Sequence, residues 1–310
     1  MESLASLRIF AAVCETGSLS AVARAEGCTQ SAVSQHVKRL EADHGVALVE
    51  RGRSGVTPTP AGDILYRAVQ DSLGTLAAAR RRLRELREGE AGTLRITTGG
   101  TTLRHFMIEA LARLRHSHPG LAIEFRSATS TAGCIEEVRA NRADLAFVTL
   151  GPPIRGLQQR PVVQAPWVLV APRDDPLVEG ERIDPRRLRQ ARYLAMHAGS
   201  RSRKLLEAQL AEHGVHLDPV ATVDDWDTAV RLVEVGLGHA VVPALWVHDL
   251  GEHDRLRALP LDGVDPATFG WIARRWDALN PLALAFVAET QRQLGGTEHA
   301  AGISLVEPAT

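Results

Sequence analysis

The chain has 310 residues, of which 45% are hydrophobic and 24% are charged, and its formal net charge is −1. This length suits two domains of about 100–200 residues each, and the composition is that of a globular protein. Three cysteines cannot form a disulfide scaffold in a chain of this size, and no uncharged apolar run approaches the roughly 18–20 residues of a membrane helix. Glu2 precedes the first apolar stretch, where a signal peptide would carry a basic residue, so we expect a cytoplasmic protein.

The small net charge is unevenly distributed along the chain. Residues 1–87 carry 12 Lys and Arg against 9 Asp and Glu, a net charge of +3, whereas residues 88–310 carry 24 against 28, a net charge of −4. A basic first part on an acidic remainder indicates that only the N-terminal part contacts a polyanion such as DNA. The asymmetry is modest and needs a motif to support it.

Residues 18–41 carry the sharpest motif of the chain. Ser18 and Thr29 are predicted N-caps of two short helices. At 100° per residue, the second helix gathers its apolar side chains on one face: Val33, Val37 and Leu40. Its other face carries side chains that can contact base edges or phosphate: Ser31, Ser34, Gln35 and Lys38. The alternative is an ordinary amphipathic helical hairpin, whose outer face is polar in any case.

The segment that follows, ALVERGRSGVTPTPAG at residues 47–62, predicts a two-stranded wing. Arg51 and Arg53 lie near the tip of this hairpin, where they suit contact with phosphate or the minor groove. For Arg53 alone the alternative is a solvated loop charge. The order of helix, turn, helix and basic wing is far more specific than any one of these parts.

Residues 60–87 then form one long helical pattern with a seam at a spacing of 4-3-4-3-4-3, which is a 3.5-residue repeat. The seam consists of Leu65, Val69, Ser72, Leu76, Ala79, Leu83 and Leu86. This pattern predicts a dimerisation helix that packs antiparallel against its twin. The alternative is a helix docked on its own chain.

From Leu94 onward, short apolar runs alternate with helical stretches. Strands are predicted at 94–100, 121–127, 144–150, 167–173 and 239–245, and helices near 102–116, 131–141, 200–213 and 225–236. Such alternation is typical of an α/β fold with mostly parallel sheets. We expect residues 301–310 to form a loose tail.

The C-terminal part lacks the motifs of common enzymes and of metal or redox sites. It contains no GxSxG, HExxH, P-loop or CxxC pattern, so we expect neither catalysis nor a cofactor. His116 and His118 lie beside Pro119 at a helix end, and we interpret them as surface residues rather than as metal ligands. Cys134 is the only cysteine of this part, which argues against a disulfide switch.

Three strand-to-helix turns are rich in hydroxyl groups: residues 97–102, 127–133 and 197–204. Free N–H groups and the helix dipole at such turns favour anions, so the sequence predicts a cleft for a small organic acid. We expect Thr101, Thr102, Ser130 and Ser200 at this ligand, with either Arg201 or Arg203 balancing its charge. The alternative is that these residues only cap their helices, because such turns favour Ser, Thr and Gly anyway.

Residues 17–62, GSLSAVARAEGCTQSAVSQHVKRLEADHGVALVERGRSGVTPTPAG, resemble the winged helix-turn-helix of LysR-type transcriptional regulators, and the resemblance extends along the whole chain. It implies an α/β protein with an all-α winged helix-turn-helix domain at residues 1–60, in which the helix-turn-helix element covers about 18–37. A linker and dimerisation helix follows at 61–91. The effector domain at 92–300 is then two α/β subdomains, similar to periplasmic solute-binding proteins.

The resemblance also implies site residues. Those at the major groove are Gln30, Ser31, Ser34 and Gln35, with Arg53 in the wing. Those at the effector are Gly100, Thr101, Ser130, Thr149, His197 and Ser200. The chain departs from the family pattern where Val49 replaces Phe, Ser31 replaces Pro and Pro58 replaces Leu. Gly99 and Gly100 replace Ser-Pro, which removes one hydroxyl from the first turn.

We therefore expect a sequence-specific transcriptional regulator whose operator binding is modulated by a small-molecule effector. Pairing through the linker helix predicts a dimer, assembling to a tetramer, on a roughly palindromic operator of double-stranded DNA. A solute-binding protein is the rival that the C-terminal part alone would fit. The N-terminal motif and the missing signal peptide disfavour it.

Overall fold

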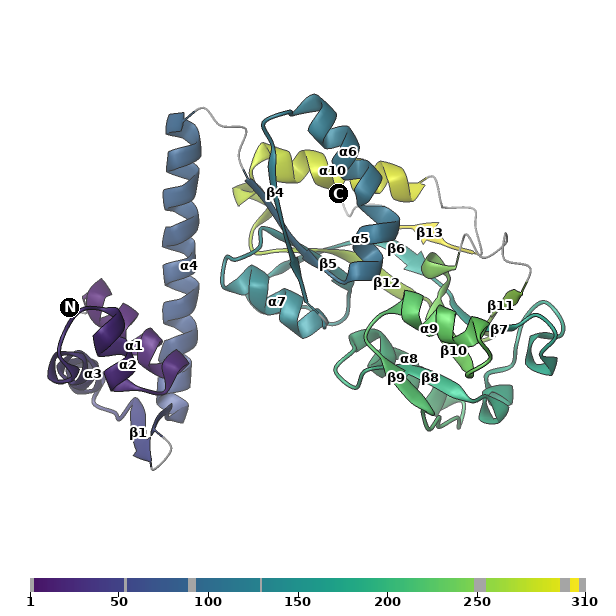
Figure 1. Cartoon of the computed structure of the whole chain (residues 1–310), viewed down its shortest axis with the longest axis horizontal. Helices are drawn as coiled ribbons and strands as arrows, with labels where there is room; N and C mark the ends of the chain where they lie inside the picture. The colour runs from purple at the N-terminus through teal and green to yellow at the C-terminus, as the bar shows by residue number, and fades with distance from the viewer. Residues whose placement is uncertain are drawn as a thin grey trace. The chain divides into compact units, whose positions relative to one another are not determined.

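The computed structural model of the protein describes residues 3–52, 55–88, 93–128, 130–247, 255–295 and 302–306. The chain divides into two compact units, Met1–Arg87 and Glu88–Thr310 (Figure 1). Within the described ranges, no helix is both long enough and apolar enough to cross a membrane.

The first unit consists of three short helices, a β-hairpin and one long helix. In chain order these are α1 (Leu4–Thr16), α2 (Leu19–Ala25), α3 (Gln30–His44), β1 (Val49–Gly52), β2 (Gly55–Pro58) and α4 (Pro60–Glu88). The side chains of Ser18 and Thr29 each accept a backbone N–H three residues ahead at 3.2 Å, so both predicted N-caps are confirmed. The predicted apolar face of α3 is buried: Val33, Val37 and Leu40. A two-stranded antiparallel wing follows, as predicted.

Helix α4 starts against the three-helix head of its unit and then extends past it. Leu65 packs on the head and Val69 is buried. Further along the helix, Leu76 is 43% exposed and Leu83 is 66% exposed. The first two positions of the predicted seam therefore pack on their own chain, as the alternative proposed, whereas these later leucines are exposed.

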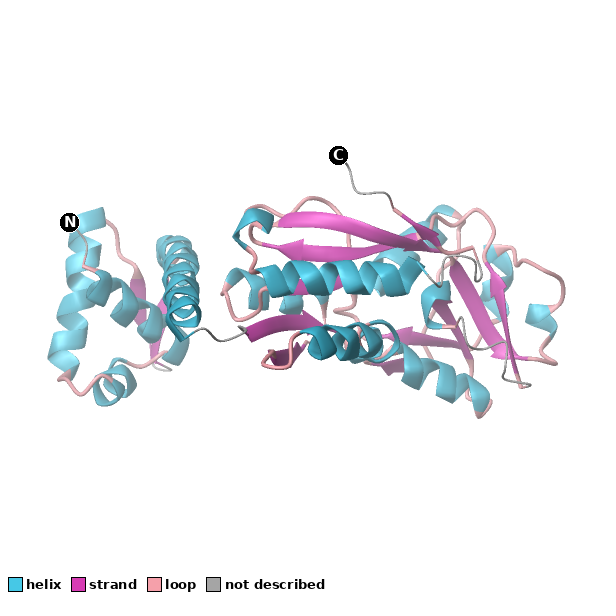
Figure 2. Cartoon of the chain, turned by 90° about the horizontal axis from the view of Figure 1, so that it is seen from above, coloured by secondary structure: helices cyan, strands magenta, loops and turns pink. Residues whose placement is uncertain are grey.

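The second unit contains two mixed sheets with helices packed along them (Figure 2). The first sheet, in the order β13-β6-β12-β5-β3-β4, consists of β3 (Thr93–Thr98), β4 (Ala122–Ser127), β5 (Leu145–Thr149), β6 (Gln158–Ala165), β12 (Ala267–Ala273) and β13 (Ser304–Leu305). The second, in the order β11-β7-β10-β8-β9, consists of β7 (Trp167–Pro172), β8 (Tyr193–Met196), β9 (Ala221–Val223), β10 (His239–Pro243) and β11 (Leu256–Pro260). The helices are α5 (Gly100–Phe106), α6 (Ile108–Ser117), α7 (Thr131–Arg139), α8 (Arg201–Glu212), α9 (Trp226–Glu234) and α10 (Pro281–Gly295). We call the parts built on these sheets the first and second subdomains.

Each sheet is parallel on one side only. β3 pairs in parallel with β4 and β5, whereas β12 and β6 are antiparallel to their neighbours. β8 likewise lies parallel between β9 and β10, whereas β7 and β11 are antiparallel. The expectation of mostly parallel sheets is therefore wrong. The chain passes from β6 directly into β7 of the other sheet and returns in β12, without the helical crossovers that make neighbouring strands parallel.

The C-terminal residues join the first sheet. Ser304 and Leu305 pair with β6 in antiparallel register, and the Val306 N–H donates to the Val162 carbonyl at 2.9 Å. Ile303 is buried in the main core. The expectation of a loose tail is therefore wrong for residues 302–306.

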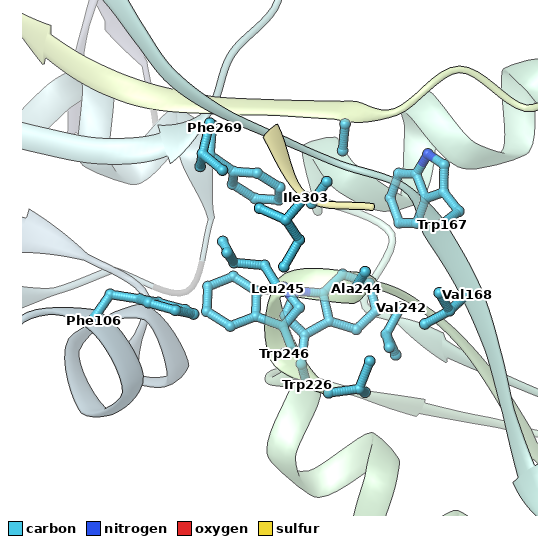
Figure 3. Close-up of a cluster of buried hydrophobic side chains, with 14 of the residues drawn as sticks. Phe106, Trp167, Val168, Trp226, Val242, Ala244, Leu245, Trp246, Phe269 and Ile303 are labelled. Atoms are coloured by element: carbon cyan, nitrogen blue, oxygen red, sulfur yellow. The ribbon is translucent and has the colours of Figure 1, made fainter. Parts of the chain in front are cut away.

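An aromatic cluster joins the two subdomains (Figure 3). Trp246 lies in a short helical turn after β10, in the second subdomain. Its ring centroid is 5.1 Å from that of Phe106, at the end of α5, and 5.8 Å from that of Phe269, on β12. Because both partners belong to the first subdomain, this buried contact holds the subdomains together beside the region where the predicted polar turns meet.

Candidate functional site

The outer face of α3 carries the side chains predicted to read DNA. Gln30, Ser31, Gln35 and Lys38 are exposed, and Ser34 is half-buried. The Ser20 hydroxyl of α2 donates to Gln30 Oε1 at 3.1 Å, which ties the start of α3 to the preceding helix. These side chains carry amide, hydroxyl and ammonium groups that suit base edges and phosphates.

The opposite side of α3 is anchored by a polar contact as well as by its apolar face. His36 Nδ1 lies 2.9 Å from Ser6 Oγ on α1, and Ser6 in turn lies 2.9 Å from Ser3 Oγ. Ser6 is fully buried, so its two hydrogen bonds satisfy a hydroxyl that would otherwise be costly to enclose. Sequence reasoning missed His36. Its place three residues after Val33 and four before Leu40, which puts it on the buried side of the helix, was the available signal.

The wing is attached to the turn between α1 and α2. The Val56 N–H of β2 donates to the Gly17 carbonyl at 2.8 Å. In the β-ladder Arg51 lies opposite Val56, and Gly52 opposite Gly55 closes the hairpin. Arg53 lies outside the described residues, so its predicted role at the wing tip stays a prediction.

The second unit has a cavity of about 290 Å³ between its subdomains. All but one of the predicted effector residues line it: Gly100, Thr101, Thr102, Ser130, Thr149, Ser200 and Arg201. His197 is not among the residues that line the cavity. Its Nδ1 instead accepts the Gly199 N–H at 3.2 Å, so the ring shapes the turn that leads into α8.

The hydroxyls of two predicted turns also cap their own helices, as the alternative proposed. Ser130 Oγ accepts the Gly133 N–H at 3.1 Å, and Ser200 Oγ accepts the Arg203 N–H at 3.3 Å. A hydroxyl that accepts one bond still has a proton to donate, so capping leaves both groups able to bind an anion. Thr101 is only 4% exposed, and its Oγ1 has no hydrogen-bond partner among the described residues.

Arg201 and Arg203 have different surroundings, in agreement with the prediction that at most one of them enters the cleft. Arg203 donates to Glu207 Oε1 at 2.6 Å and to the Met196 carbonyl at 2.8 Å, all within the second subdomain. Arg201 lines the cavity instead. Its neighbour Ser202, a hydroxyl-bearing residue of the predicted turn at 197–204, has its Oγ 2.6 Å from Thr149 Oγ1 and so bridges the two subdomains.

Charged and aromatic side chains that the sequence did not single out complete the cavity. Arg104 of α5 lines it and donates through Nε to Asp227 Oδ2 on α9 at 2.8 Å. Its Nη2 also lies 3.7 Å from Asp225 Oδ1. The remaining acidic and aromatic lining residues are Asp224, Phe147, Trp226, Trp246 and Phe269. These partners lie far apart in sequence, so no local pattern could have revealed them.

Neither reactive thiols nor metal ligands mark this cavity. Cys134 lines it, but burial raises the pKa of its thiol above the ordinary value, which keeps it protonated and weakly nucleophilic. Among the described residues, no group of three or more His, Cys, Asp or Glu side chains is arranged to hold a metal ion. The cavity therefore offers hydroxyls, the guanidinium groups of Arg104 and Arg201, carboxylates and aromatic walls, which suit binding of a small molecule.

Comparison with known proteins matches both units to one family. Residues 87–295 match the LysR substrate binding domain, and residues 4–63 match the bacterial regulatory helix-turn-helix protein model of the lysR family. The regulator CbbR of Sinorhizobium medicae is 30% identical over 287 residues, 90% of this chain and 87% of that protein. The uncharacterised regulator YbhD of Escherichia coli is 26% identical over 288 residues, 92% and 90% of the two chains.

Solved structures show the same fold. The crystal structure of CbnR, a LysR family transcriptional regulator, superposes with a TM-score of 0.61 at 20% identity, covering 94% of this chain and 99% of that one. A full-length OxyR variant from Pseudomonas aeruginosa gives a TM-score of 0.63 at 20% identity, covering 100% and 99%. At this identity the likeness concerns the architecture alone.

Proposed function

Since this chain belongs to the LysR family of DNA-binding transcriptional regulators, we propose that α3 reads its operator and that a small organic acid in the cavity modulates this binding. The observation that carries the first part is the division of α3 into a buried apolar face and an exposed polar face. The observation that carries the second part is the cavity of about 290 Å³, on which three predicted hydroxyl-bearing turns converge.

In the DNA complex, the side chains on the outer face of α3 enter the major groove. Gln35 and Gln30 suit bidentate contacts with adenine, and Lys38 suits guanine or phosphate. Ser31 and Ser34 supply short adaptable hydroxyls. Arg51 and Arg53 of the wing contact phosphate or the minor groove, which adds affinity for many sequences.

The protein acts as a dimer through α4, and a tetramer is the larger assembly we expect. The exposed Leu76 and Leu83 support this proposal, because two apolar side chains one heptad apart can pair with a second helix. A two-fold dimer then matches a roughly palindromic operator in the cytoplasm. Leu76→Glu/Leu83→Glu should yield monomers in sedimentation velocity, and unchanged dimers would contradict pairing along this seam.

The effector is a small monocarboxylate. Arg201 and the hydroxyls of Ser130 and Ser200 favour an anion, whereas the carboxylates of Asp224 and Asp225 on the same cavity disfavour a high negative charge. The aromatic side chains that line the cavity add apolar contact for the rest of the ligand.

Two experiments test the proposal. Sequencing genomic fragments captured by the purified protein should return a shared palindromic site, and capture without sequence preference would contradict a specific regulator. Thermal-shift screening of organic acids should find a stabilising acid for the wild type that acts less on Thr101→Val/Ser200→Ala. Equal stabilisation of the double variant would remove these residues from the site.

A further inference from the structure

Gly151 occupies a special place opposite Arg201. It follows β5 in the first subdomain, whereas Arg201 is the first residue of α8 in the second. A Cβ placed on Gly151 would overlap the Nη2 and Cζ atoms of Arg201 and would lie 2.6 Å from Nε. The guanidinium group therefore occupies the volume that any side chain at position 151 would need.

A nearby hydrogen bond fixes the loop that contains Gly151 relative to the start of α8. Two residues before Gly151, Thr149 Oγ1 lies 2.6 Å from Ser202 Oγ, the residue after Arg201. The buried hydroxyl pair and the Gly151–Arg201 contact thus join the same loop to the same helix start. Because the loop and the helix belong to different subdomains, the position of the guanidinium depends on a residue that is remote in sequence.

Arg201 differs from Arg104 and Arg203 in its surroundings. Arg104 pairs with Asp225 and Asp227, and Arg203 pairs with Glu207. Within the described part of the chain, no carboxylate pairs with Arg201 and no hydrogen bond engages it. A guanidinium group that is half-buried and unpaired gains most from an incoming carboxylate, which it can bind through a charge-assisted hydrogen bond.

We propose that Gly151 is a positioning residue: the lack of a side chain there seats the Arg201 guanidinium in the cavity, where it selects a negatively charged effector. This inference rests on the proposed function of the cavity. It adds to that function a residue, Gly151, that determines which ligand charge the cavity prefers although its absent side chain makes no hydrogen bond to the ligand. A larger residue at position 151 displaces the arginine and makes the cavity favour neutral ligands.

The positioning of the Arg201 guanidinium by Gly151 can be tested without any effector. In the full chain, phenylglyoxal labelling of arginines followed by peptide mass spectrometry should modify Arg201 several-fold faster in Gly151→Ala than in the wild type. Gly99→Ala is the matched control, because it adds a methyl group to the same cavity with no atom within 4 Å. Equal labelling of Arg201 in the wild type and Gly151→Ala would overturn the proposed seat.

The consequence for binding is tested with acetate, isobutyrate and phenylacetate, each compared with its neutral amide. Gly151→Ala should weaken binding of the acids about ten-fold, the cost of losing one charge-assisted hydrogen bond, and leave the amides unchanged. Gly151→Ala/Arg201→Gln should bind no more weakly than Arg201→Gln alone, because the glycine acts through the arginine. If the double variant lost the affinity for acids that the two single variants lose together, Gly151 would not act through Arg201. If Gly151→Ala bound the acids as tightly as the wild type, the proposed charge selection would be wrong.

The two proposals fail separately. If none of the three acids binds the wild-type protein, the carboxylate effector is contradicted, while the labelling rates still decide whether Gly151 seats Arg201. If the acids bind but Arg201 is labelled equally fast in the wild type and in Gly151→Ala, the effector proposal is supported and the proposed role of Gly151 is contradicted.

Discussion

Replacing Gly62 with alanine tests how closely the long helix is packed on the DNA-binding head. Gly62 lies in the first turn of α4, where a Cβ would overlap the carbonyl oxygen of Leu48 and lie 2.9 Å from its carbonyl carbon. That carbonyl accepts the Thr59 N–H at 3.0 Å, and the Leu48 side chain is 2% exposed. Relieving the overlap therefore requires movement of backbone rather than of a flexible side chain.

Two opposing effects determine how much Gly62→Ala changes the free energy of unfolding. Alanine is intrinsically favoured over glycine in a helix by about 1 kcal/mol. Overpacking a close-packed site costs about 1–3 kcal/mol, and more when backbone must shift. The steric cost exceeds the propensity, so we expect Gly62→Ala to lower the free energy of unfolding of the first unit by about 1–2 kcal/mol. For a unit of this size that corresponds to a fall in Tm of roughly 5–15 °C.

The assay can separate the two units, because all five tryptophans lie in the second one. Calorimetry of the full chain should show the transition of the first unit at lower temperature, while the tryptophan fluorescence transition stays in place. Gly295→Ala is a control without backbone overlap, since its added Cβ meets only Leu305 Cδ1, at 3.5 Å, and it should not destabilise the chain. An unchanged or higher Tm of the first unit in Gly62→Ala would refute this account of the packing.

The remaining predictions concern DNA binding and acid stability. Gln35→Ala and Ser34→Ala should each reduce discrimination between operator and random DNA in competition binding, by about 1–3 kcal/mol where a bidentate contact is lost, and unchanged specificity would place this helix outside the major groove. Arg53→Ala should weaken binding to all sequences and flatten the salt slope by about one unit, whereas equal affinity at low and high salt would show that the wing tip does not contact DNA. Burial opposes a lower pKa for Asp175, but hydrogen bonds from His239 and the Leu177 N–H, together with the attraction of His239, lower it overall. The stabilisation of the folded state by the Asp175 carboxylate is therefore complete above the ordinary Asp pKa of about 4, and it is lost as the pH falls through the lower pKa of the folded state. In urea unfolding followed by tryptophan fluorescence, Asp175→Asn should accordingly lose less stability than the wild type below pH 4, and parallel curves would contradict this linkage.

Local chemistry made the first unit predictable. Ser18 and Thr29 act within three residues of themselves, and the two faces of α3 follow from helix geometry alone. The polar turns around the cavity were visible for the same reason, because helix N-termini select Ser, Thr and Gly. What local chemistry could not predict was the direction in which a side chain points: His197 lies in the expected turn, but its ring accepts the backbone N–H of Gly199 and does not line the cavity.

Strand β6 shows why other elements escaped prediction. Its sequence, QQRPVVQA, contains Pro161, and a proline inside a run normally argues against a strand because it cannot donate to the ladder. In the structure the register between β6 and β12 shifts at Phe269 and Gly270, opposite this proline. Gly270 also lets the backbone of β6 approach, since a Cβ there would lie 2.8 Å from Pro161 Cα. The strand exists because of a partner about 100 residues away, which no local pattern contains.

The contacts between the subdomains determine what an effector must do to change DNA binding. The Thr149–Ser202 hydrogen bond, the Arg104–Asp227 pair and the aromatic cluster around Trp246 already stabilise the present arrangement. A ligand shifts such an equilibrium only by its differential affinity, and a nearly complete shift requires about 5.5 kcal/mol. One charge-assisted hydrogen bond to Arg201 supplies about 1.5–3 kcal/mol, which is not enough alone. An effective ligand must therefore contact Ser130 on the first subdomain as well as α8 on the second, and acids too small to reach both walls should bind without altering the affinity for DNA.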